Sequence, residues 1–279
     1  MENTKINWAD NTFNPWTGCT KVSQGCAHCY AERMDSRQLH GKERHWGKGV
    51  PRKLRAESYW KQAFTWDRKA ARRGKRTLVF CASTADWADP EAPAGMRDRL
   101  WETIRQTPHL NWLLLTKRPE QIRKYLPADW GRGYLNVWLG VSAEDTKKGV
   151  PRITVLKKIP AMVRFVSFEP LLENLGELDL TGIHWVIIGG ETGPKARSMD
   201  AQWAKSIVAQ CRKQKVAAWV KQLGRYPKLN GTRLRLVDDD GKWDRKGDNA
   251  RIWPRGLKGL SMRRHPKLLG VAGSNGRSW

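Results

Sequence analysis

The chain has 279 residues, of which 39% are hydrophobic, and its 52 Lys and Arg against 27 Asp and Glu give a formal net charge of +25. Sixteen tryptophans exclude a disordered basic tail protein, because such chains lack large apolar groups. No stretch approaches the ~18 uninterrupted apolar residues of a membrane span, and the first residues lack the basic and apolar regions of a signal peptide. We therefore expect a cytoplasmic protein without a membrane partner, and the charge favours nucleic acid as a partner because phosphates relieve the repulsion between cations.

Short apolar runs recur along the first four fifths of the chain. The first strand is predicted at residues 6–8, and the six later runs are Leu78–Ala82, Trp112–Thr116, Val137–Val141, Val163–Ser167, Trp185–Ile188 and Ala217–Val220. Helix-length segments such as 95–106 and 201–214 separate them. Continuous apolar runs with this spacing are typical of buried parallel strands. The pattern predicts an α/β fold over residues 1–225, a full or partial TIM-like parallel β/α barrel of about seven βα units, with a doubly wound open sheet as the alternative.

Three of the five cysteines lie close together near the N-terminus. Cys19, Cys26 and Cys29 have the spacing C-x6-C-x2-C, and no fourth cysteine is nearby. Three thiolates can hold three irons of a [4Fe–4S] cluster and leave the fourth iron open to another ligand. One alternative is a zinc site completed by His28 or His40, and another is a reactive thiol cluster. An odd number of cysteines in a cytoplasmic chain argues against a disulfide framework.

Residues 31–76 follow the cysteines directly and mix many cations with aromatic residues. Such a mixture suits phosphate contacts together with base stacking, although a solvated helix face with long cationic side chains is the alternative. We predict a basic insertion here, near the barrel mouth. Its candidate nucleic-acid contacts are Arg33, Arg37, Arg44, Arg52, Lys53, Arg55, Trp46, Tyr59 and Trp60.

A second basic region is predicted as a C-terminal extension and tail over residues 226–279. No acidic residue occurs after Asp248, while cations such as Arg263, Arg264 and Lys267 accumulate. The last dozen residues are rich in Gly and Ser and are typical of a flexible tail. We expect this region to contribute mainly non-specific capture of nucleic acid.

Polar segments follow the predicted strands, at residues 81–89, 116–120, 142–148, 167–170, 189–193 and 221–224. Ligands of parallel α/β folds bind at the carboxyl ends of the strands, where side chains and helix N-termini converge. The six segments therefore predict one shared site. A zinc site alone would not need this rim, whereas a cofactor with a carboxylate, an amino group, a ribose and an adenine would.

Six elements occur in order over about residues 5–225: NPWTGCTKVSQGCAHCYAER, LLTKRPE, VWLGVSAED, VRFVSFEPLL, WVIIGGETGP and VKQLG. They resemble a phage-encoded three-cysteine-motif family, which looks like a divergent radical-SAM branch distantly similar to spore photoproduct lyase. The resemblance implies a partial barrel, a [4Fe–4S] cluster, S-adenosylmethionine (SAM), an electron donor such as flavodoxin or ferredoxin, and the bacterial host cytoplasm. The chain departs from the usual radical-SAM pattern in its C-x6-C-x2-C spacing and in a Gly-Gly-Glu segment that follows a late strand.

Under this resemblance the polar rim would contact SAM. The candidates for the adenine are His28 and Tyr30, and Lys117 or Arg118 could pair with the methionyl carboxylate. Ser142, Glu144 and Glu169 could contact the ribose or the amino group. The glycine-rich segment comprises Gly189, Gly190 and Glu191. A helix N-cap or a surface ion pair is the alternative for each of these residues.

Two further residues are catalytic candidates. Cys81 ends a predicted strand and could return a hydrogen atom to a product radical, although a lone strand cysteine is more often a small core residue. Lys221 ends the last predicted strand and is a candidate for a substrate phosphate or the SAM carboxylate. Cys211 has core spacing within a predicted helix, which indicates packing.

We therefore predict a radical-SAM-like [4Fe–4S] enzyme that uses SAM to generate a 5′-deoxyadenosyl radical and modifies or repairs a nucleotide in DNA. A barrel cannot reach a base inside a duplex, so the target would be flipped out or single-stranded. One alternative is a zinc-stabilised, non-catalytic nucleic-acid-binding protein. Another is a radical-SAM enzyme that acts on a nucleotide, a protein or a small molecule.

Overall fold

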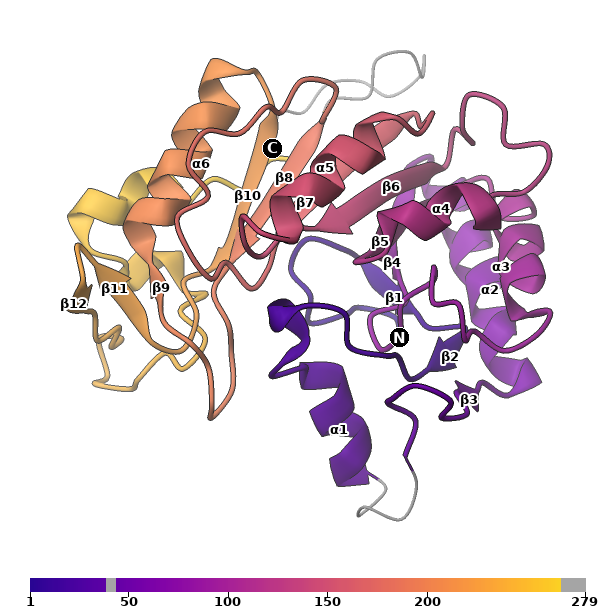
Figure 1. Cartoon of the computed structure of the whole chain (residues 1–279), viewed down its shortest axis with the longest axis horizontal. Helices are drawn as coiled ribbons and strands as arrows, with labels where there is room; N and C mark the ends of the chain where they lie inside the picture. The colour runs from indigo at the N-terminus through magenta and orange to yellow at the C-terminus, as the bar shows by residue number, and fades with distance from the viewer. Residues whose placement is uncertain (39–43, 267–279) are drawn as a thin grey trace.

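Seven parallel strands form one curled sheet in the computed structural model, which describes residues 1–38 and 44–266 (Figure 1). The strands are β1 (Asn11–Phe13), β4 (Thr77–Cys81), β5 (Leu110–Thr116), β6 (Val137–Ser142), β7 (Val163–Phe168), β8 (Trp185–Gly189) and β10 (Ala217–Gln222). Their order in the sheet is the order in the chain, from β1 to β10. A doubly wound sheet would reverse direction part-way, so the fold is the partial barrel that the apolar runs predicted.

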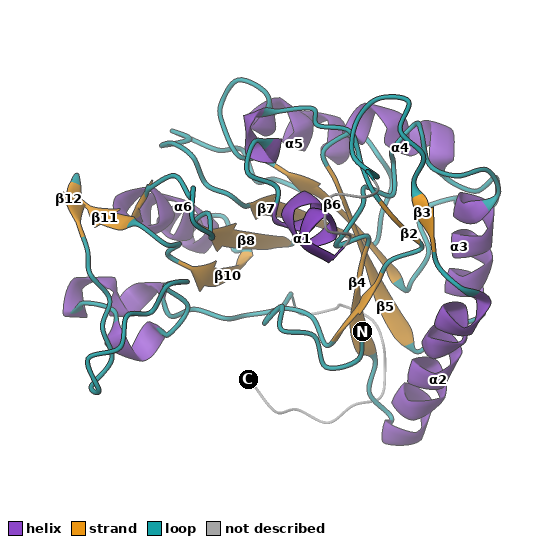
Figure 2. Ribbon diagram, turned by 90° about the horizontal axis from the view of Figure 1, so that it is seen from below, coloured by secondary structure: helices purple, strands orange, loops and turns teal. Residues whose placement is uncertain are grey.

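Helices cover the outer face of this sheet (Figure 2). They are α2 (Glu57–Arg73), α3 (Met96–Arg105), α4 (Pro119–Tyr125), α5 (Gly149–Lys157) and α6 (Ala201–Lys213). Helix α2 packs on β4 and β5, α5 on β6 and β7, and α6 on β8 and β10. The helices predicted at 95–106 and 201–214 are confirmed. The connection from β7 to β8 contains no helix, so the βα repeat is incomplete. None of the described helices is long and apolar enough to cross a bilayer.

Alternating side chains divide the interior into two clusters. On β4, Val79 and Cys81 belong to the core between sheet and helices, whereas Phe80 between them belongs to the cluster on the other face. That second cluster is mainly aromatic and contains Trp138 and Trp185. Most of the tryptophans are thus core residues. Within the described residues only three keep partial exposure, and these are Trp46, Trp203 and Trp243.

The first strand lies a few residues later than the sequence predicted. The prediction at residues 6–8 is wrong, because β1 comprises Asn11–Phe13 and pairs with Val79–Cys81 of β4. Asn11 and Thr12 are buried but polar, so the segment does not form an apolar run. Trp8, which suggested the strand, instead fills the aromatic cluster on the other face of the sheet.

Residues 31–76 are not a single basic insertion. Helix α1 (Tyr30–Gln38) comes first, β3 (Lys53–Leu54) pairs antiparallel with β2 (Trp16–Thr17), and α2 is the helix of the first βα unit. Trp60, Ala63, Trp66 and Ala70 are buried on α2. Helix α2 therefore belongs to the barrel, so the basic insertion predicted over residues 31–76 cannot include it.

The C-terminal extension is folded onto the barrel as far as the structure describes it. Strands β9 (Met199–Asp200), β11 (Pro227–Leu229) and β12 (Thr232–Arg233) form a small sheet, which the short helices η2 (Ala250–Ile252) and η3 (Arg255–Leu260) follow. A further short helix, η1 (Gln24–Cys26), lies near the N-terminus between β2 and α1. The Val220 N–H donates to the Met262 carbonyl at 2.9 Å, and the Arg264 N–H donates to the Ala218 carbonyl at 3.0 Å. These bonds cover the edge of β10, which would otherwise present unpaired backbone groups.

Candidate active site

The cysteine loop, residues 18–30, crosses the carboxyl end of the sheet next to α1 (Figure 1). Near its start the Gly18 N–H donates to the Thr84 carbonyl, and at its end the Tyr30 hydroxyl donates to the Ser83 carbonyl at 2.6 Å. Between them the loop meets residues that follow β5, β6 and β8. Residues that follow three of the strands therefore lie against the cysteine loop.

Two buried arginines hold the start of this loop. Arg118, directly after β5, donates to the Thr20 carbonyl at 2.6 Å and to the Cys19 Sγ at 3.5 Å. Arg52 donates to the Thr20 hydroxyl at 2.7 Å, and its side chain has no exposed surface. Because both guanidinium groups are fixed in the interior, the position of Cys19 is set before any ligand binds.

The partners of these arginines are carboxylates that the sequence analysis did not single out. Asp86 lies 2.9 Å from Arg118 Nη1 and also accepts the Thr116 hydroxyl, while Asp89 lies 2.9 Å from Arg52 Nη2. Both belong to the segment 81–89 after β4, whose polar content marked it as part of the rim. The signal that could have found them is the pair of aspartates in a strand-end loop with two arginines to match.

Glu144, after β6, supports the middle of the loop. Its carboxylate is fully buried and pairs with Lys117 Nζ at 2.8 Å and with Arg152 Nη1 at 2.7 Å. Burial by itself would raise the pKa of Glu144, but the two cations outweigh it and hold the pKa below its ordinary value. A side chain at Gly25 would overlap the Glu144 carboxylate, so the loop can approach here only as glycine.

Glu191, after β8, joins the end of the loop to the opposite rim. It accepts from Arg197 Nη2 at 2.8 Å and lies 3.1 Å from His28 Nδ1, while Arg197 also donates to the Gln24 carbonyl. Burial raises the pKa of Glu191, but the hydrogen bonds from Arg197 and His28 overcome this and lower it. The Gly-Gly-Glu segment thus contacts the cysteine loop through Glu191.

Glu169 and Lys221 form a half-buried pair on the strand ends. Lys221 Nζ lies 3.0 Å from Glu169 Oε1, and the Ser167 hydroxyl donates to Glu169 Oε2 at 3.1 Å. A Cβ at Gly189 would come within 2.5 Å of the Glu169 carboxylate, and one at Gly190 would come within 2.4 Å of the Leu223 carbonyl. The two glycines therefore make room for this pair and for the close contact between the ends of β8 and β10.

The other predicted residues of the rim are placed unevenly. Ser142 ends β6 and is buried, with its carbonyl accepting from Arg152. Tyr30 is exposed apart from its hydroxyl contact. Cys81 is fully buried in the core between sheet and helices, where burial raises its thiol pKa, and Cys211 is buried in the same core. The packing alternative for Cys81 is supported, and its role as a hydrogen-atom donor stays a prediction.

The three loop cysteines are free and partly exposed. No three His, Cys, Asp or Glu side chains of the described residues form a group that could hold a single metal ion. His28, a candidate zinc ligand, faces Glu191 instead, and His40 lies outside the described residues. A [4Fe–4S] cluster makes a different demand, because each cysteine binds its own iron. Three cysteines without disulfide partners on one loop match the number of thiolates that such a cluster takes.

The predicted nucleic-acid contacts need two corrections. Arg52 is buried beneath the loop, where its guanidinium forms ion pairs with Asp89 and Glu91. Trp60 is 2% exposed and belongs to the core. Neither can meet a phosphate or a base here. Arg55 donates to the Thr17 hydroxyl, and Tyr59 accepts from the Asn14 N–H while its ring packs on Phe13.

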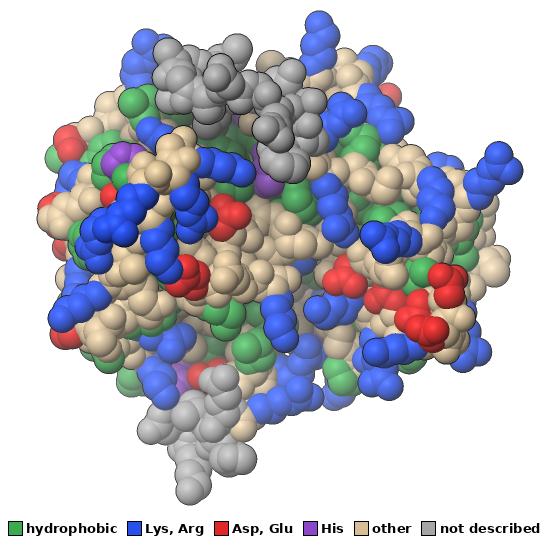
Figure 3. All heavy atoms as spheres, turned by 180° about the vertical axis from the view of Figure 1, so that it is seen from behind, with side chains coloured by type: hydrophobic (Ala, Val, Ile, Leu, Met, Phe, Trp, Pro, Cys, Tyr) green, Lys and Arg blue, Asp and Glu red, His purple; other side chains and the backbone are tan. Residues whose placement is uncertain are grey.

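Other members of that set remain at the surface. Arg37, Arg44 and Lys53 are exposed, Trp46 is partly exposed, and Arg33 lies against Gly193 of the Gly-Gly-Glu loop. On the face shown in Figure 3, cations are spread over much of the surface with carboxylates among them. Lys267, which belongs to the basic tail, lies outside the described residues.

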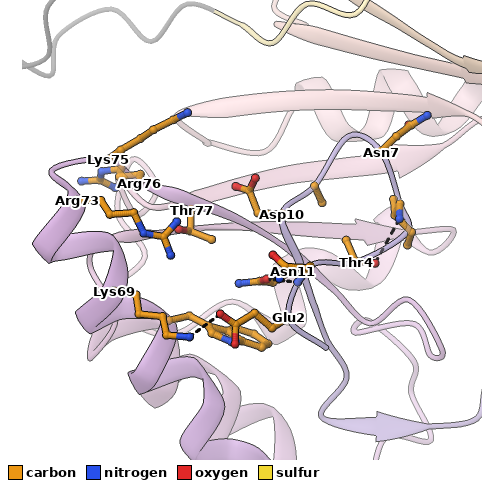
Figure 4. A pocket seen from close by; sticks show the side chains of 14 residues that line it. Glu2, Thr4, Asn7, Asp10, Asn11, Lys69, Arg73, Lys75, Arg76 and Thr77 are labelled. Carbon is orange, nitrogen blue, oxygen red and sulfur yellow. Dashed lines mark hydrogen bonds and ion pairs between the residues drawn. The ribbon is translucent and has the colours of Figure 1, made fainter.

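A separate cavity of about 430 Å³ lies at the amino ends of β1 and β4 (Figure 4). Its walls include Lys69, Arg73 and Asp10, and Lys69 pairs with Glu2 at 2.6 Å. Because this cavity opens at the end of the strands opposite to the cysteine loop, it is not part of the candidate site.

The profile of one protein family, described as Protein of unknown function (DUF5131), matches residues 3–271. The chain belongs to this family. A search of the curated proteins found no match. The phage origin and the three-cysteine motif that the sequence suggested stay predictions.

Three solved structures of spore photoproduct lyase are similar to the DUF5131 chain. A double mutant with bound AdoMet and dinucleoside spore photoproduct has a TM-score of 0.45 at 15% identity, covering 76% of this chain and 63% of that one. A single mutant has a TM-score of 0.45 at 16% identity, covering 77% and 64%. A complex with dinucleoside spore photoproduct has a TM-score of 0.44 at 14% identity, covering 76% and 63%. The chain thus spans less than two thirds of each of those proteins.

Proposed function

We propose that this protein is a radical-SAM-like [4Fe–4S] enzyme that modifies or repairs a nucleotide in DNA. The observation that carries the proposal is the placement of three free cysteines on one loop. Side chains that follow β5, β6 and β8, together with the buried Arg52, hold that loop over the mouth of a partial barrel. A binding protein without chemistry would not require so many strand ends to converge on its thiols.

Cys19, Cys26 and Cys29 would each hold one iron of the cluster. When bound, the cluster and SAM supply a one-electron cleavage that yields a 5′-deoxyadenosyl radical. Arg118 donates to the Cys19 Sγ and so favours its thiolate form, which opposes the burial that raises the Cys19 pKa to about 12. Arg118 would therefore assist ligation by Cys19 without itself binding iron.

Some rim residues position the cysteine loop, and others are accessible to a ligand. Arg118 and Glu144 are buried and held in ion pairs with Asp86 and with Lys117 and Arg152, so we assign them to positioning the loop. Glu169 and Lys221 are paired with each other and keep side-chain exposures of 15% and 23%, so both side chains are partly accessible. We assign these two residues, together with His28, to contacts with SAM or with the substrate.

Metal content and colour test the proposal. Protein purified without oxygen and reconstituted with iron and sulfide is expected to be brown and to carry about four of each per chain. Single changes of Cys19, Cys26 or Cys29 to Ala abolish this absorbance, whereas Cys211→Ala, the matched control in the helical core, retains it. Colourless protein with one zinc per chain supports the zinc alternative and ends the enzyme proposal.

Addition of SAM separates an open-iron cluster from a purely structural one. Chelation of SAM changes the coordination of the fourth iron, so the EPR signal of the reduced cluster is expected to shift. A spectrum that stays the same at saturating SAM contradicts the radical-SAM assignment even if the cluster is present.

A further inference from the structure

A group of arginines and aromatic rings lies where the last strand of the barrel leads into the C-terminal extension. We call it the Arg–aromatic platform and define it as Arg225, Tyr226, Arg233, Trp243 and Arg245. The sequence analysis did not single out any of these residues. They come from the end of β10, from β12 and from the turn before η2, and they meet only in the folded chain.

The cations of the platform lie over its rings. The Arg225 Cζ is 5.5 Å from the Tyr226 ring centroid and 5.1 Å from that of Trp243. Arg233 lies 4.9 Å from the Tyr226 centroid, and Arg245 lies 5.9 Å from that of Trp243. The two rings are 6.3 Å apart with an interplanar angle of 37°. Such contacts order the guanidinium groups without neutralising them.

The platform arginines differ from the buried arginines in their ion pairing. Arg52 and Arg118 each pair with aspartates. Among the ion pairs of residues 1–38 and 44–266, none involves Arg225, Arg233 or Arg245, and the last two are exposed. Three cations thus remain available to an external anion, at a place where their side chains are already ordered.

The rings are open as well. Trp243 is one of the three described tryptophans with partial exposure, and Tyr226 is also partly exposed. If the platform served only to pack the extension, we would expect its rings to be buried as Trp253 is, 1% exposed in the same segment. Half-open rings next to unpaired guanidinium groups suit a ligand with flat faces and negative charge.

The platform adjoins the candidate active site. The Arg225 N–H donates to the Glu191 carbonyl at 2.9 Å, and the Tyr226 hydroxyl donates to the Pro194 carbonyl at 3.3 Å. Glu191 in turn contacts His28 of the cysteine loop. The Gly-Gly-Glu loop therefore lies between the platform and the cysteine loop, so a polymeric ligand could contact both regions.

An acidic stretch limits how such a ligand can lie. Asp238, Asp239 and Asp240 precede Trp243, and the carboxylate of Asp238 accepts the Lys242 N–H. These carboxylates would repel the phosphates of a nucleic acid. The phosphates are therefore expected to lie along the arginines, with the bases turned toward the two rings.

From this geometry we infer that the platform binds unpaired bases of a nucleic acid strand, by stacking on Trp243 and Tyr226 and by phosphate contacts from Arg233 and Arg245. The inference deepens the proposed function and rests on it for the identity of the substrate. It names the substrate as a single-stranded or locally opened segment, because bases inside a duplex offer no free face to a ring.

The test is binding of a short fluorescein-labelled oligo-dT, followed by anisotropy at several salt concentrations. Trp243→Ala is expected to weaken binding by roughly 5- to 150-fold, the range measured for loss of one stacked base. The salt dependence should stay the same, because a ring neutralises no phosphate. Trp243→Phe should keep most of the affinity, and Trp203→Ala, a partly exposed tryptophan on α6, serves as the matched control.

The arginines are tested separately. Arg233→Ala with Arg245→Ala is expected to reduce the slope of log K against log salt by about 0.7 for each phosphate that the protein no longer neutralises. A duplex of matching sequence should lose less affinity than the single strand when Trp243 is replaced. Thermal melting of each variant checks that the fold is retained.

The outcomes separate this inference from the proposed function. If Trp243→Ala binds oligo-dT like the wild type, or if Trp46→Ala weakens binding and Trp243→Ala does not, the platform is overturned even when the cluster and SAM binding are present. If the chain carries no cluster but Trp243→Ala still weakens binding, the platform stands as a single-strand site and the enzyme proposal falls.

Discussion

Two regions of this chain look alike in sequence and differ in the folded protein. Residues 44–60 and 225–245 both combine arginines with tryptophan and tyrosine. In the first region Arg52 and Trp60 are buried, whereas in the second the arginines lie over half-open rings. The difference comes from distant carboxylates, since Asp89 and Glu91 reach Arg52 from the loop after β4. Composition identifies a possible nucleic-acid surface, but the acidic partners decide whether the cations face water or the interior.

The largest effect expected from this comparison is on stability. Arg52→Ala would remove the nearest cation of the buried Asp89 and leave it only the more distant Arg118, and loss of one partner of a buried ion pair costs about 3–5 kcal/mol. Lys53→Ala, the exposed neighbour, should change the free energy of unfolding by less than about 0.5 kcal/mol. Urea denaturation of the two variants without cluster measures both values. Equal stability of the two would contradict the role of Arg52 as a buried partner of Asp89.

Much of the fold could be predicted because its signals are local. The apolar runs of β4 to β8 and β10 are continuous, and the helix over 96–105 has regular apolar spacing. The strand β1 was missed because Asn11 and Thr12 are buried polar residues, which a hydrophobic pattern cannot show. Its burial depends on pairing with β4, more than sixty residues away.

The candidate site divides in a similar way. The cysteines and the strand-end segments carry a residue-type signal and could be proposed from spacing alone. Arg197 could not, because its importance lies in a contact with Gln24 that joins distant parts of the chain. The platform was missed for the same reason, since Tyr226 and Trp243 meet only after the extension folds back.

A smaller effect concerns pH, because Glu191 connects the platform to the cysteine loop. The contacts of Glu191 lower its pKa below the ordinary value near 4.5. An acidic group whose pKa is lower in the folded state stabilises the protein fully above its unfolded-state pKa. This contribution is lost as the pH falls through the folded-state pKa. Glu191→Gln should therefore cost about 1.5–3 kcal/mol at pH 7 and progressively less as the pH falls below 4.5.

Thermal melting of the cluster-free protein between pH 7 and pH 3 measures this contribution. Glu57→Gln is the control, because Glu57 pairs with Arg99 at a site where 78% of its side chain is exposed, and solvent screens such a pair so that it adds little stability. If Glu191→Gln and the wild type lose stability in parallel as the pH falls, the loop is not held through this carboxylate.

The smallest effect expected is on the salt dependence of binding, and it tests what remains of the first region. Arg44 and Lys53 are exposed there, so phosphates can still reach them. Reversal of both to Glu should lower the slope of log K against log salt for duplex DNA by up to about 1.8, if each residue neutralises one phosphate. The reduction should be the same for all sequences, because phosphate contacts carry no base information. Arg263→Glu with Arg264→Glu, an equal change of charge in the extension, should alter the slope less. If the first pair leaves the slope unchanged while the platform arginines reduce it, the nucleic acid follows the side of the mouth next to β8 and β10, and residues 44–60 support only the cysteine loop.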